Sequence, residues 1–449
     1  MTLRFGTDGV RGIAGIELTP ELVMALGRAA ARVMGADRFL IGRDTRRSGP
    51  MLEAALAAGL AAEGAFVERL GVLPTPAVAF LSAEELVPAA MISASHNPFA
   101  DNGVKLFGAG GRKLAGATET ALEAELDRLV ASPPASGADI GAIAERDDGG
   151  RRFVDHLAAS LEGRDLEGLT VVLDCAHGAA WRVGPLALRE LGADVTVVGA
   201  DPDGVNINSG VGSTWPGPLQ EAVLATGADI GLALDGDADR VIAVDHRGEV
   251  VDGDHLIAIC AIDLAARGRL RDHTVVVTVM TNLGFHLGMA EHGIQVVETP
   301  VGDRHVLEAM EKGRWSLGGE QSGHVVFADL ATTGDGLLTG LQVLDLVSRS
   351  GRPLSTLAVN AMTRLPQVLR NVAVAGSTGG VLAAVAGEVA EVEAELGRRG
   401  RVLIRPSGTE PVVRVMVEAP TAAEAEEAVA RLVAVVEKAG HEGTGKVRR

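Results

Sequence analysis

Residues 230–244 read IGLALDGDADRVIAV, a stretch in which two short apolar runs enclose an acidic loop. The runs 230–234 and 241–244 carry no charge and are rich in Ile, Val, Leu and Ala, which is typical of buried strands. Between them Asp235, Asp237 and Asp239 occupy alternate positions of a tight loop. Carboxylates crowded in this way repel one another, and a divalent cation with oxygen ligands is the usual compensation. The stretch therefore predicts two strands joined by a metal-binding loop.

Two alternatives apply to the same loop. One is an acidic hairpin turn, because Asp and Gly favour turns. The other is an EF-hand, but counting from Asp235 its sixth position is Arg240 instead of Gly and its twelfth is His246 instead of Glu. Three Asp without Cys or a nearby His favour Mg²⁺ over Zn²⁺. Arg240 would offset part of the remaining negative charge.

The rest of the chain alternates short β-branched runs with Ala- and Leu-rich segments of helical period. The expected strands include 38–41, 89–93, 170–174, 194–198, 228–234, 241–244, 274–279 and 295–298. The expected helices include 20–35, 49–63, 181–191, 217–226, 253–267, 282–291 and 303–312. This alternation predicts an α/β fold with mostly parallel sheets covered by helices. The strand ends near residues 40–44, 171–174 and 275–278 are alike, which suggests three related α/β units without amounting to a repeat.

The length of 449 residues suggests about three domains, with three to four allowed. Pro-, Ser- and Gly-rich segments at 132–137 and 147–150 read as a linker, and softer boundaries fall near 248–252 and 364–370. The expected domains are 1–149, 150–249, 250–365 and 366–449. The last would be a smaller α+β module of one strand, a long helix, two strands and a helix, with Thr421 and Glu424 capping the final helix.

Charge and composition exclude several classes of protein. The net charge of −18 argues against binding to nucleic acid or to anionic membranes, and an aromatic content of 3% offers no platform for stacking bases. Cys175 and Cys260 lack CxxC spacing, so a reducing, cytoplasmic location is expected. The start of the sequence shows no apolar signal region, and no apolar run approaches the ~20 residues of a membrane span.

Residues 93–98 read SASHNP and follow the apolar strand expected at 89–92. A hydroxyl at a strand end beside His96 makes Ser95 a candidate nucleophile. A Ser/Asn/Pro turn is the alternative, and the hydrolase nucleophile elbow fails because Ser93 and Asn97 stand where it needs Gly. Residues 101–103 are expected to form a turn, and Lys105 to open the next strand. A catalytic role for Lys105, rather than that of a surface charge, requires it to face Ser95.

Two further loops are rich in polar groups. Residues 318–324 read GGEQSGH and are suited to hydrogen-bonding sugar hydroxyls, although a Gly-rich turn with an exposed His is the simpler explanation. Residues 405–411 read RPSGTEP, and with Arg414 they supply the hydroxyls, backbone N–H groups and guanidinium groups of an anion cradle. The chain has no Walker motif and no GxGxxG after a strand, so no nucleotide cofactor is indicated. Together the four loops describe phosphoryl transfer on a phosphosugar in a cleft.

These motifs, with GTDGVRG at residues 6–12, follow the order found in the α-D-phosphohexomutases, and the whole chain resembles that family. The resemblance implies three related α/β domains with mixed, mostly parallel sheets and a smaller α+β C-terminal domain around a central cleft. It implies that Ser95 is carried as phosphoserine and that Asp235, Asp237 and Asp239 hold one Mg²⁺ per subunit together with the Ser95 phosphate. It also implies a sugar bisphosphate intermediate and an activating hexose bisphosphate.

The resemblance also implies roles for single residues. Arg11 and His96 would support the phosphoserine, and Lys105 would act as general acid and base. The sugar would be bound by Arg240, Glu320, Gln321, Ser322 and His324. The phosphate that does not react would be held by Arg405, Ser407, Gly408, Thr409 and Arg414.

Within the family, three features indicate the members that interconvert glucosamine 6-phosphate and glucosamine 1-phosphate for UDP-N-acetylglucosamine synthesis. They are Gln321, where hexose mutases commonly carry Met, and the runs VGDR at 301–304 and PDGVNIN at 202–208. His305 departs from the usual Tyr. A mutase for glucose or mannose phosphates is one alternative. A non-catalytic sugar-phosphate sensor is another, although Ser95 and the three Asp are all present. The oligomeric state is left open, a homodimer being one option.

Overall fold

The computed structural model describes residues 5–6, 9–129, 134–374, 378–406 and 412–442. These residues fall into two units. The first comprises residues 1–280 and 292–361, and the second comprises 281–291 and 362–449. The three domain boundaries expected from the sequence remain predictions.

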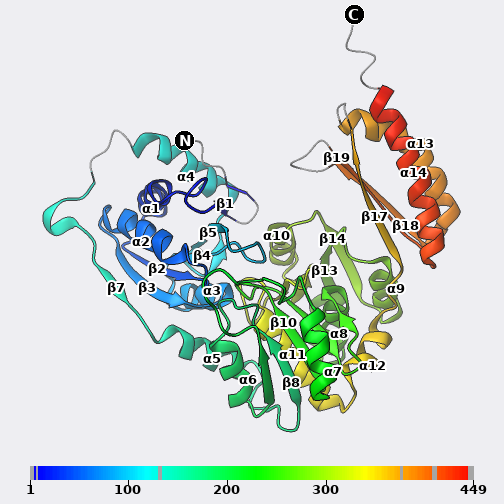
Figure 1. The fold of residues 1–449 in the computed structure, drawn as a ribbon, viewed down its shortest axis with the longest axis horizontal. Coiled ribbons are helices and arrows are strands. Elements are labelled where there is room, and N and C mark those ends of the chain that lie inside the picture. The colour runs from blue at the N-terminus through cyan, green and yellow to red at the C-terminus, as the bar shows by residue number, and fades with distance from the viewer. Residues whose placement is uncertain (1–4, 7–8, 130–133, 375–377, 407–411, 443–449) are drawn as a thin grey trace, which may run out of the picture. The chain divides into compact units, whose positions relative to one another are not determined.

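The first sheet of the first unit has a parallel centre (Figure 1). Its parallel strands are β2 (Arg38–Arg43), β3 (Phe66–Val72), β4 (Ala89–Ile92) and, at one edge, β7 (Ile143–Glu145). The antiparallel strands at the other edge are β5 (Asp101–Gly108), β1 (Val10–Ile13) and β6 (Arg112–Lys113).

The second and third sheets repeat this arrangement. In the second, β9 (Asp194–Val198), β8 (Thr170–Asp174) and β10 (Ile230–Leu234) are parallel, and β11 (Val241–Asp245) and β12 (Val250–Val251) are antiparallel. In the third, β14 (Gln295–Thr299), β13 (Thr274–Thr278) and β15 (Leu317–Gly319) are parallel, and β16 (Val325–Phe327) is antiparallel. The mixed, mostly parallel α/β fold expected from the sequence is confirmed.

All three sheets share one strand order. The first parallel strand in the chain lies between the second and the third, and a fourth, antiparallel strand lies outside the third, as in β3-β2-β4-β5, β9-β8-β10-β11 and β14-β13-β15-β16. The loop between the third and fourth strands contains residues 93–100 in the first sheet, 235–240 in the second and 320–324 in the third. Three of the four loops expected to carry chemistry therefore occupy the same place in the three sheets.

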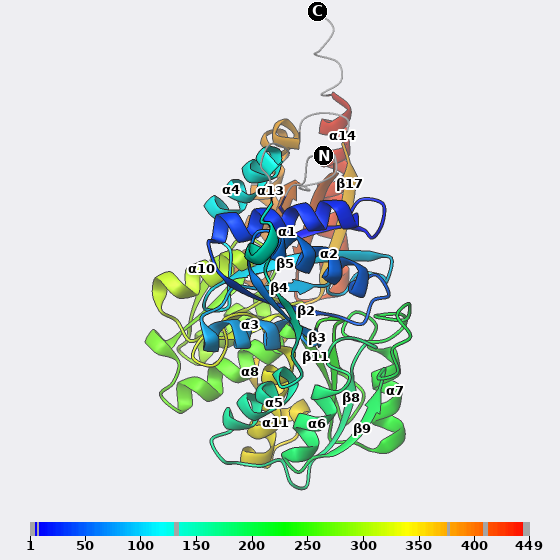
Figure 2. The ribbon, with the colours of Figure 1, turned by 90° about the vertical axis from the view of Figure 1, so that its left-hand side faces the viewer.

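Helices α1 (Pro20–Met34) and α2 (Gly49–Ala61) cover one face of the first sheet, and α3 (Thr75–Glu85) covers the other (Figure 2). Helices α1 and α2 lie side by side and cross at glycines. A Cβ atom on Gly27 would lie 2.5 Å from the carbonyl oxygen of Leu56, and one on Gly59 would collide with that of Met24. Glycine at these positions permits the close approach of the two helix backbones.

The remaining helices of the first unit are α4 (Gly116–Arg128), α5 (Gly149–Ala159), α6 (Val183–Glu190), α7 (Gly217–Thr226), α8 (Gly253–Ala266), α10 (Asp303–Gly313), α11 (Gly336–Ser350) and α12 (Leu354–Ala361). Every strand and helix range expected from the sequence is present, with ends within two residues in this unit and in the second. No described helix is both long and apolar enough to cross a membrane.

One local expectation is wrong. Residues 101–103 do not form a turn, because β5 begins at Asp101 and Lys105 lies inside it. Asn102 and Gly103 pair with Gly12 and Arg11 of β1. A Cβ atom on Gly103 would lie 2.6 Å from the carbonyl oxygen of Ser93, so this glycine allows close packing instead of a chain reversal.

The second unit is an antiparallel sheet with helices on one face (Figure 1). Strand β19 (Val412–Glu418) lies between β17 (Gln367–Ala373) and β18 (Arg401–Pro406), and α13 (Thr378–Leu396) and α14 (Ala422–Glu442) pack on them. Buried Glu418 accepts a hydrogen bond from the backbone N–H of Leu283, the first residue of α9 (Leu283–Glu291), at 2.8 Å. The expected capping box is confirmed, because Thr421 and Glu424 exchange hydrogen bonds of 3.1 and 3.2 Å.

Candidate active site

Ser95 lies directly beyond β4 in an unusual conformation. Its φ is +53°, in the left-handed region that non-glycine residues rarely adopt, and it is 1% exposed. Its hydroxyl group donates a hydrogen bond of 2.6 Å to Oδ2 of Asp235. Its backbone N–H donates to Oγ of Ser93, which in turn donates to Asp44. The structure therefore places the candidate nucleophile against the acidic loop of the second sheet.

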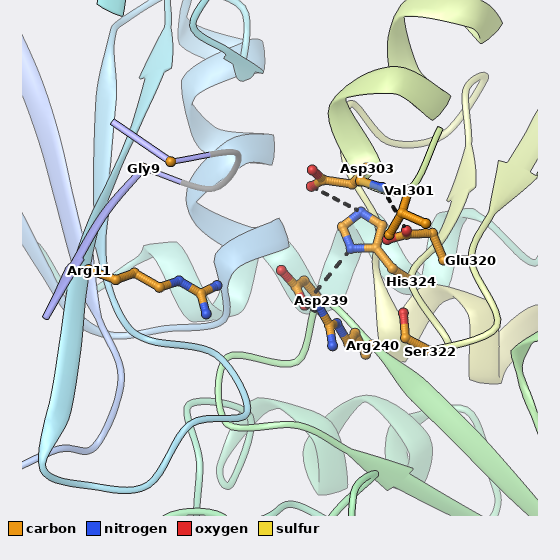
Figure 3. Close-up of a pocket in the computed structure, with 11 residues that line it drawn as sticks. Gly9, Arg11, Asp239, Arg240, Val301, Asp303, Glu320, Ser322 and His324 are labelled. Carbon is orange, nitrogen blue, oxygen red and sulfur yellow. Dashed lines mark hydrogen bonds and ion pairs between the residues drawn. The ribbon is translucent and has the colours of Figure 1, made fainter. Parts of the chain in front are cut away.

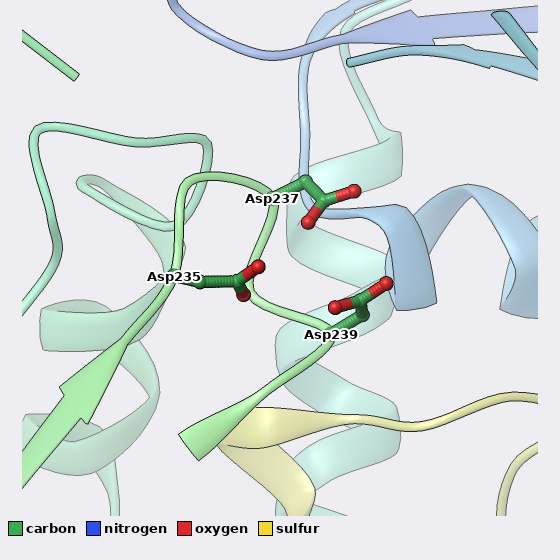
Figure 4. Close-up of side chains that lie close together, drawn as sticks. All are labelled: Asp235, Asp237 and Asp239. Carbon is green, nitrogen blue, oxygen red and sulfur yellow. The ribbon is translucent and has the colours of Figure 1, made fainter. Parts of the chain in front are cut away.

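The acidic loop joins β10 to β11, and its three carboxylates turn toward one another (Figure 4). Asp235, Asp237 and Asp239 are all buried, and each offers a ligand oxygen within 4.8 Å of the others. Nζ of Lys105 lies 2.8 Å from Oδ2 of Asp237 and 3.0 Å from Oδ2 of Asp239. Thr75, at the start of α3, donates from its hydroxyl and its backbone N–H to Asp237.

The electrostatics of this loop are those of a site for a hard divalent cation. Burial raises the pKa of Asp235 well above its ordinary value, and the charges of Asp239 and Asp237 raise it further. Within the described part of the chain, Oδ1 of Asp237 is buried and accepts no hydrogen bond. Crowded oxygen donors of this kind can hold a metal ion, and the triad fits one.

His96 and Arg240 lie beside Ser95 and the acidic loop. Nδ1 of His96 is 3.2 Å from Nη1 of Arg240 and 3.3 Å from Oγ of Ser95. Burial, together with the charges of Arg240 and Arg11, lowers the pKa of His96 to about 4. His96 is therefore neutral near pH 7, and its Nδ1 can accept the hydrogen bond from Arg240.

The loop between β15 and β16 carries two polar side chains that accept hydrogen bonds from backbone N–H groups. Oε1 of Glu320 accepts a hydrogen bond of 3.1 Å from the backbone N–H of Gly302. His324 is 3% exposed, and its Nε2 accepts a hydrogen bond from Gly334, so the proton of the neutral ring lies on Nδ1. The ring of His324 lies between two carboxylates (Figure 3). Its Nδ1 is 4.0 Å from Oδ1 of Asp239, and its Nε2 is 3.8 Å from Oδ2 of Asp303.

A cavity of about 580 Å³ within the first unit is lined by residues that belong to or adjoin all three of its sheets (Figure 3). Arg11 enters it from β1, Asp239 and Arg240 from the second sheet, and Glu320, Ser322 and His324 from the third. A volume of this size suits a phosphorylated monosaccharide, and the lining is polar and of mixed charge.

Other expected residues are placed differently. The backbone oxygen of Gln321 accepts from Gly253, and Gln321 is not among the described residues that line the cavity. Arg405 and Arg414 belong to the second unit and face each other across the β18–β19 ladder. Burial and the charge of Arg414 lower the pKa of Arg405. Nε of Arg414 is buried and donates to no described group. Ser407, Gly408 and Thr409 lie outside the described residues.

Two residues at the site escaped the sequence analysis. Thr75 holds Asp237, and Asp303 lines the cavity, pairs with Lys113 and has Oδ2 3.8 Å from Nε2 of His324. Asp303 belongs to the run 301–304, whose sequence indicates the subgroup but not a place in the cavity. Thr75 carries no local signal of its role, because Asp237 is 162 residues away in the sequence.

Four family models match the chain in order. They describe phosphoglucomutase/phosphomannomutase α/β/α domain I at residues 2–131, domain II at 151–248, domain III at 252–365 and the C-terminal domain at 369–435. Among solved structures, a phosphoglucomutase/phosphomannomutase family protein from Burkholderia thailandensis shares the fold with a TM-score of 0.79 and 24% identity, over 96% of this chain and 97% of that one. N-acetylphosphoglucosamine mutase from Aspergillus fumigatus, in complex with GlcNAc-6P and magnesium, gives a TM-score of 0.69 at 20% identity, over 98% and 96% of the two chains.

Similarity to curated proteins is stronger. The phosphoglucosamine mutase of Frankia alni is 54% identical over 98% of this chain and 99% of its own. The phosphoglucosamine mutase of Symbiobacterium thermophilum is 52% identical over 97% and 99% of the two chains. Both the family models and the relatives span nearly the whole sequence, so the chain belongs to the phosphoglucomutase/phosphomannomutase family, the α-D-phosphohexomutases.

Proposed function

We propose that the chain is a phosphoglucosamine mutase, an isomerase that interconverts glucosamine 6-phosphate and glucosamine 1-phosphate through a phosphoserine at position 95. Relatives with this activity at 52–54% identity support the substrate. The observation that carries the chemistry is the hydrogen bond of 2.6 Å between Ser95 and Asp235, which joins a buried hydroxyl to a loop suited to a cation.

Asp235, Asp237 and Asp239 would hold Mg²⁺, together with an oxygen of the Ser95 phosphate. Bound there, Mg²⁺ would neutralise negative charge on the transferring phosphoryl group. The chain's own cations add to this effect, because Lys105 pairs with two of the carboxylates and Arg240 lies next to His96. Neutral His96 would present a hydrogen-bonding ring beside the phosphoserine without a second positive charge.

In the forward direction, a sugar hydroxyl of glucosamine 6-phosphate would attack the phosphorus atom of phosphoserine 95. A new bond from phosphorus to the sugar oxygen forms as the bond to Oγ of Ser95 breaks, which gives glucosamine 1,6-bisphosphate. The proton of the sugar hydroxyl would pass to the uncharged form of Lys105, whose Nζ is buried beside the loop and is the cationic partner of the carboxylates when protonated. The bisphosphate then reverses its orientation and transfers its other phosphate to Ser95.

The cavity supplies groups for the sugar. Glu320, Ser322, His324 and Arg240 line it, and Glu320 is an acceptor suited to the amine at C2. The distant phosphate would bind to Arg405 and Arg414, aided by Ser407, Gly408 and Thr409. Two Arg in register on adjacent strands repel each other, and a bound phosphate would relieve that repulsion. An activating hexose bisphosphate would restore phosphate to Ser95 after its loss.

Substrate competition tests this function. We expect kcat/KM for glucosamine 6-phosphate to exceed that for glucose or mannose phosphates by at least about tenfold, since one buried hydrogen bond at C2 is worth about 1–3 kcal/mol. Equal or faster turnover of mannose phosphate would assign the chain to the hexose mutases of the same family. No turnover of any of these phosphosugars, in the presence of Mg²⁺ and a hexose bisphosphate, would favour a non-catalytic sensor.

A further inference from the structure

Ser95 is held in its left-handed conformation by two side chains that have no assigned role. Its backbone oxygen accepts hydrogen bonds of 2.9 Å from Nη2 of Arg46 and of 2.9 Å from Nδ2 of Asn208. The same two groups also donate to the backbone oxygen of Asn97, at 2.9 and 3.1 Å. Two carbonyl groups of one loop are therefore bound by the same pair of donors.

Arg46 follows β2 and is completely buried. Its guanidinium group uses all five N–H donors. Nε donates to Asp44 at 2.8 Å, Nη1 donates to the carbonyl oxygens of Pro98 and Asp101, and Nη2 donates to those of Ser95 and Asn97. An arginine with one carboxylate and four backbone acceptors fixes the course of the loop from residue 95 to residue 101.

Asp44 closes the circuit from the other side. It accepts hydrogen bonds from Arg46 and from Oγ of Ser93, and Oγ of Ser93 accepts the backbone N–H of Ser95 at 3.0 Å. The peptide groups on both sides of Ser95 are thus tied to one buried carboxylate. A non-glycine residue at positive φ costs energy, and such networks are what keeps it there.

Asn208 reaches the same loop from the second sheet, where it ends the segment 202–208. Its own backbone N–H donates to Ala176 at 2.9 Å. It also adjoins the acidic loop, because a Cβ atom on Gly236 would lie 2.9 Å from Nδ2 of Asn208 and 2.6 Å from the carbonyl oxygen of Ser95. Asn208 therefore sits where the loop of Ser95 meets the loop of Asp235.

We propose that Arg46 and Asn208 are positioning residues that fix the backbone of Ser95 from two sides and so set the direction of its Oγ toward Asp235. This proposal rests on the proposed function, in which Ser95 carries the phosphoryl group. Arg46 orients the loop within the first sheet, and Asn208 sets its distance from the second. Misplacing a reacting group by about 1 Å can cost on the order of a hundredfold in rate, so the clamp acts on kcat.

The test compares Asn208→Asp with Asn206→Asp. Asn206 lies in the same segment, but the hydrogen bonds that its side chain makes with described residues are those with Asp201 and Asp203, far from Ser95 in the chain. Asn208→Asp replaces the donor with an acceptor that faces two carbonyl oxygens, and Asn208→Ala removes the donor without adding charge. Each protein is purified and assayed for kcat, for KM with glucosamine 6-phosphate, and for melting temperature.

We expect both Asn208 variants to lose at least about tenfold in kcat, with KM within about threefold of wild type and melting temperatures close to that of Asn206→Asp. Arg46→Lys, which keeps the charge beside Asp44 but offers fewer donors, should show the same split if the Asn208 variants fold poorly. The proposal would be overturned if the Asn208 variants had the same kcat as Asn206→Asp. It would also be overturned if their lower kcat came together with a raised KM and a lowered melting temperature. Ser95→Ala, assayed in parallel, separates the two claims, because wild-type turnover there contradicts the proposed function itself.

Discussion

The hydroxyl group of Ser95 and the carboxylate of Asp235 form a buried hydrogen bond of 2.6 Å although 140 residues separate them in the sequence. Each residue follows the third strand of its own sheet, and each precedes the antiparallel fourth strand. The candidate nucleophile and the candidate metal loop thus form one site, and they occupy equivalent positions in two sheets that share one strand order.

Ser95→Ala should abolish mutase activity, with a loss of several orders of magnitude, because among the described residues no other hydroxyl group donates to Asp235. Folding should be retained, as judged by circular dichroism and melting temperature. Ser93→Ala is the matched control. It breaks the contact with Asp44 and should cost about 1–3 kcal/mol in stability while leaving far more activity. Near-wild-type turnover by Ser95→Ala would refute the phosphoserine.

Asp237→Asn should weaken the metal site, since it removes one of three clustered carboxylates. Treatment of the wild-type enzyme with EDTA should abolish activity, and added Mg²⁺ should restore it. The variant should need a higher Mg²⁺ concentration for half-maximal rate, while the backbone hydrogen bond from Thr75 to Asp237 and the contact of Lys105 with Asp239 still anchor the loop. Full activity in the presence of the chelator would contradict the role of the triad.

The positions of these loops could be predicted because each is a polar segment between two apolar strands, a pattern visible over about fifteen residues. The residues around them could not. Arg46 and Thr75 act on partners about 50 and 162 residues away, and nothing in their local sequence marks those contacts. The sequence predicts a turn at residues 101–103, since Asn and Gly favour turns, whereas it is close packing against Ser93 that requires Gly103.

Arg405→Ala should raise KM for glucosamine 6-phosphate by at least about tenfold, since a bidentate contact to phosphate would be lost. Arg405 is paired in register with Arg414, and the removal of one charge should not destabilise the sheet. Arg399→Ala, in the same unit but 67% exposed, is the control and should leave KM unchanged. An unaltered KM in Arg405→Ala would show that the phosphate binds elsewhere.

Gln321→Met should narrow the preference for glucosamine 6-phosphate over glucose 6-phosphate. The backbone oxygen of Gln321 accepts a hydrogen bond from the backbone N–H of Gly253, and a change of side chain does not remove this bond. The substitution should therefore affect the neighbouring Glu320 and Ser322 more than the stability of the fold. The ratio of the two kcat/KM values, measured by competition, is the readout. An unchanged ratio would mean that Gln321 marks the subgroup without setting its specificity.

Glu85→Gln should lower stability at neutral pH. Burial alone would raise the pKa of Glu85, but hydrogen bonds from Arg146 and Arg152 lower it from 4.5 to about 2. The folded state therefore binds this proton more weakly than the unfolded chain does. The stabilisation is complete above pH 4.5 and is lost as the pH falls toward 2.

For this partly screened carboxylate we expect a loss of about 1 kcal/mol in the free energy of unfolding at pH 7. The variant should also show a flatter decline in stability between about pH 4.5 and 2. Urea unfolding across this range is the measurement. Glu84→Gln is the control, because that carboxylate is 49% exposed and, within the described part of the chain, forms an ion pair only with Arg152. Parallel pH curves for wild type and Glu85→Gln would contradict the assignment.

The intact mass of the purified, active enzyme, followed by mapping of any phosphopeptide, tests the central claim most directly. The account predicts that a fraction of the protein carries one additional phosphate, that this phosphate maps to Ser95, and that Ser95→Ala lacks it. Active enzyme with phosphate on another residue, or full turnover by protein that never carries phosphate on Ser95, would contradict it.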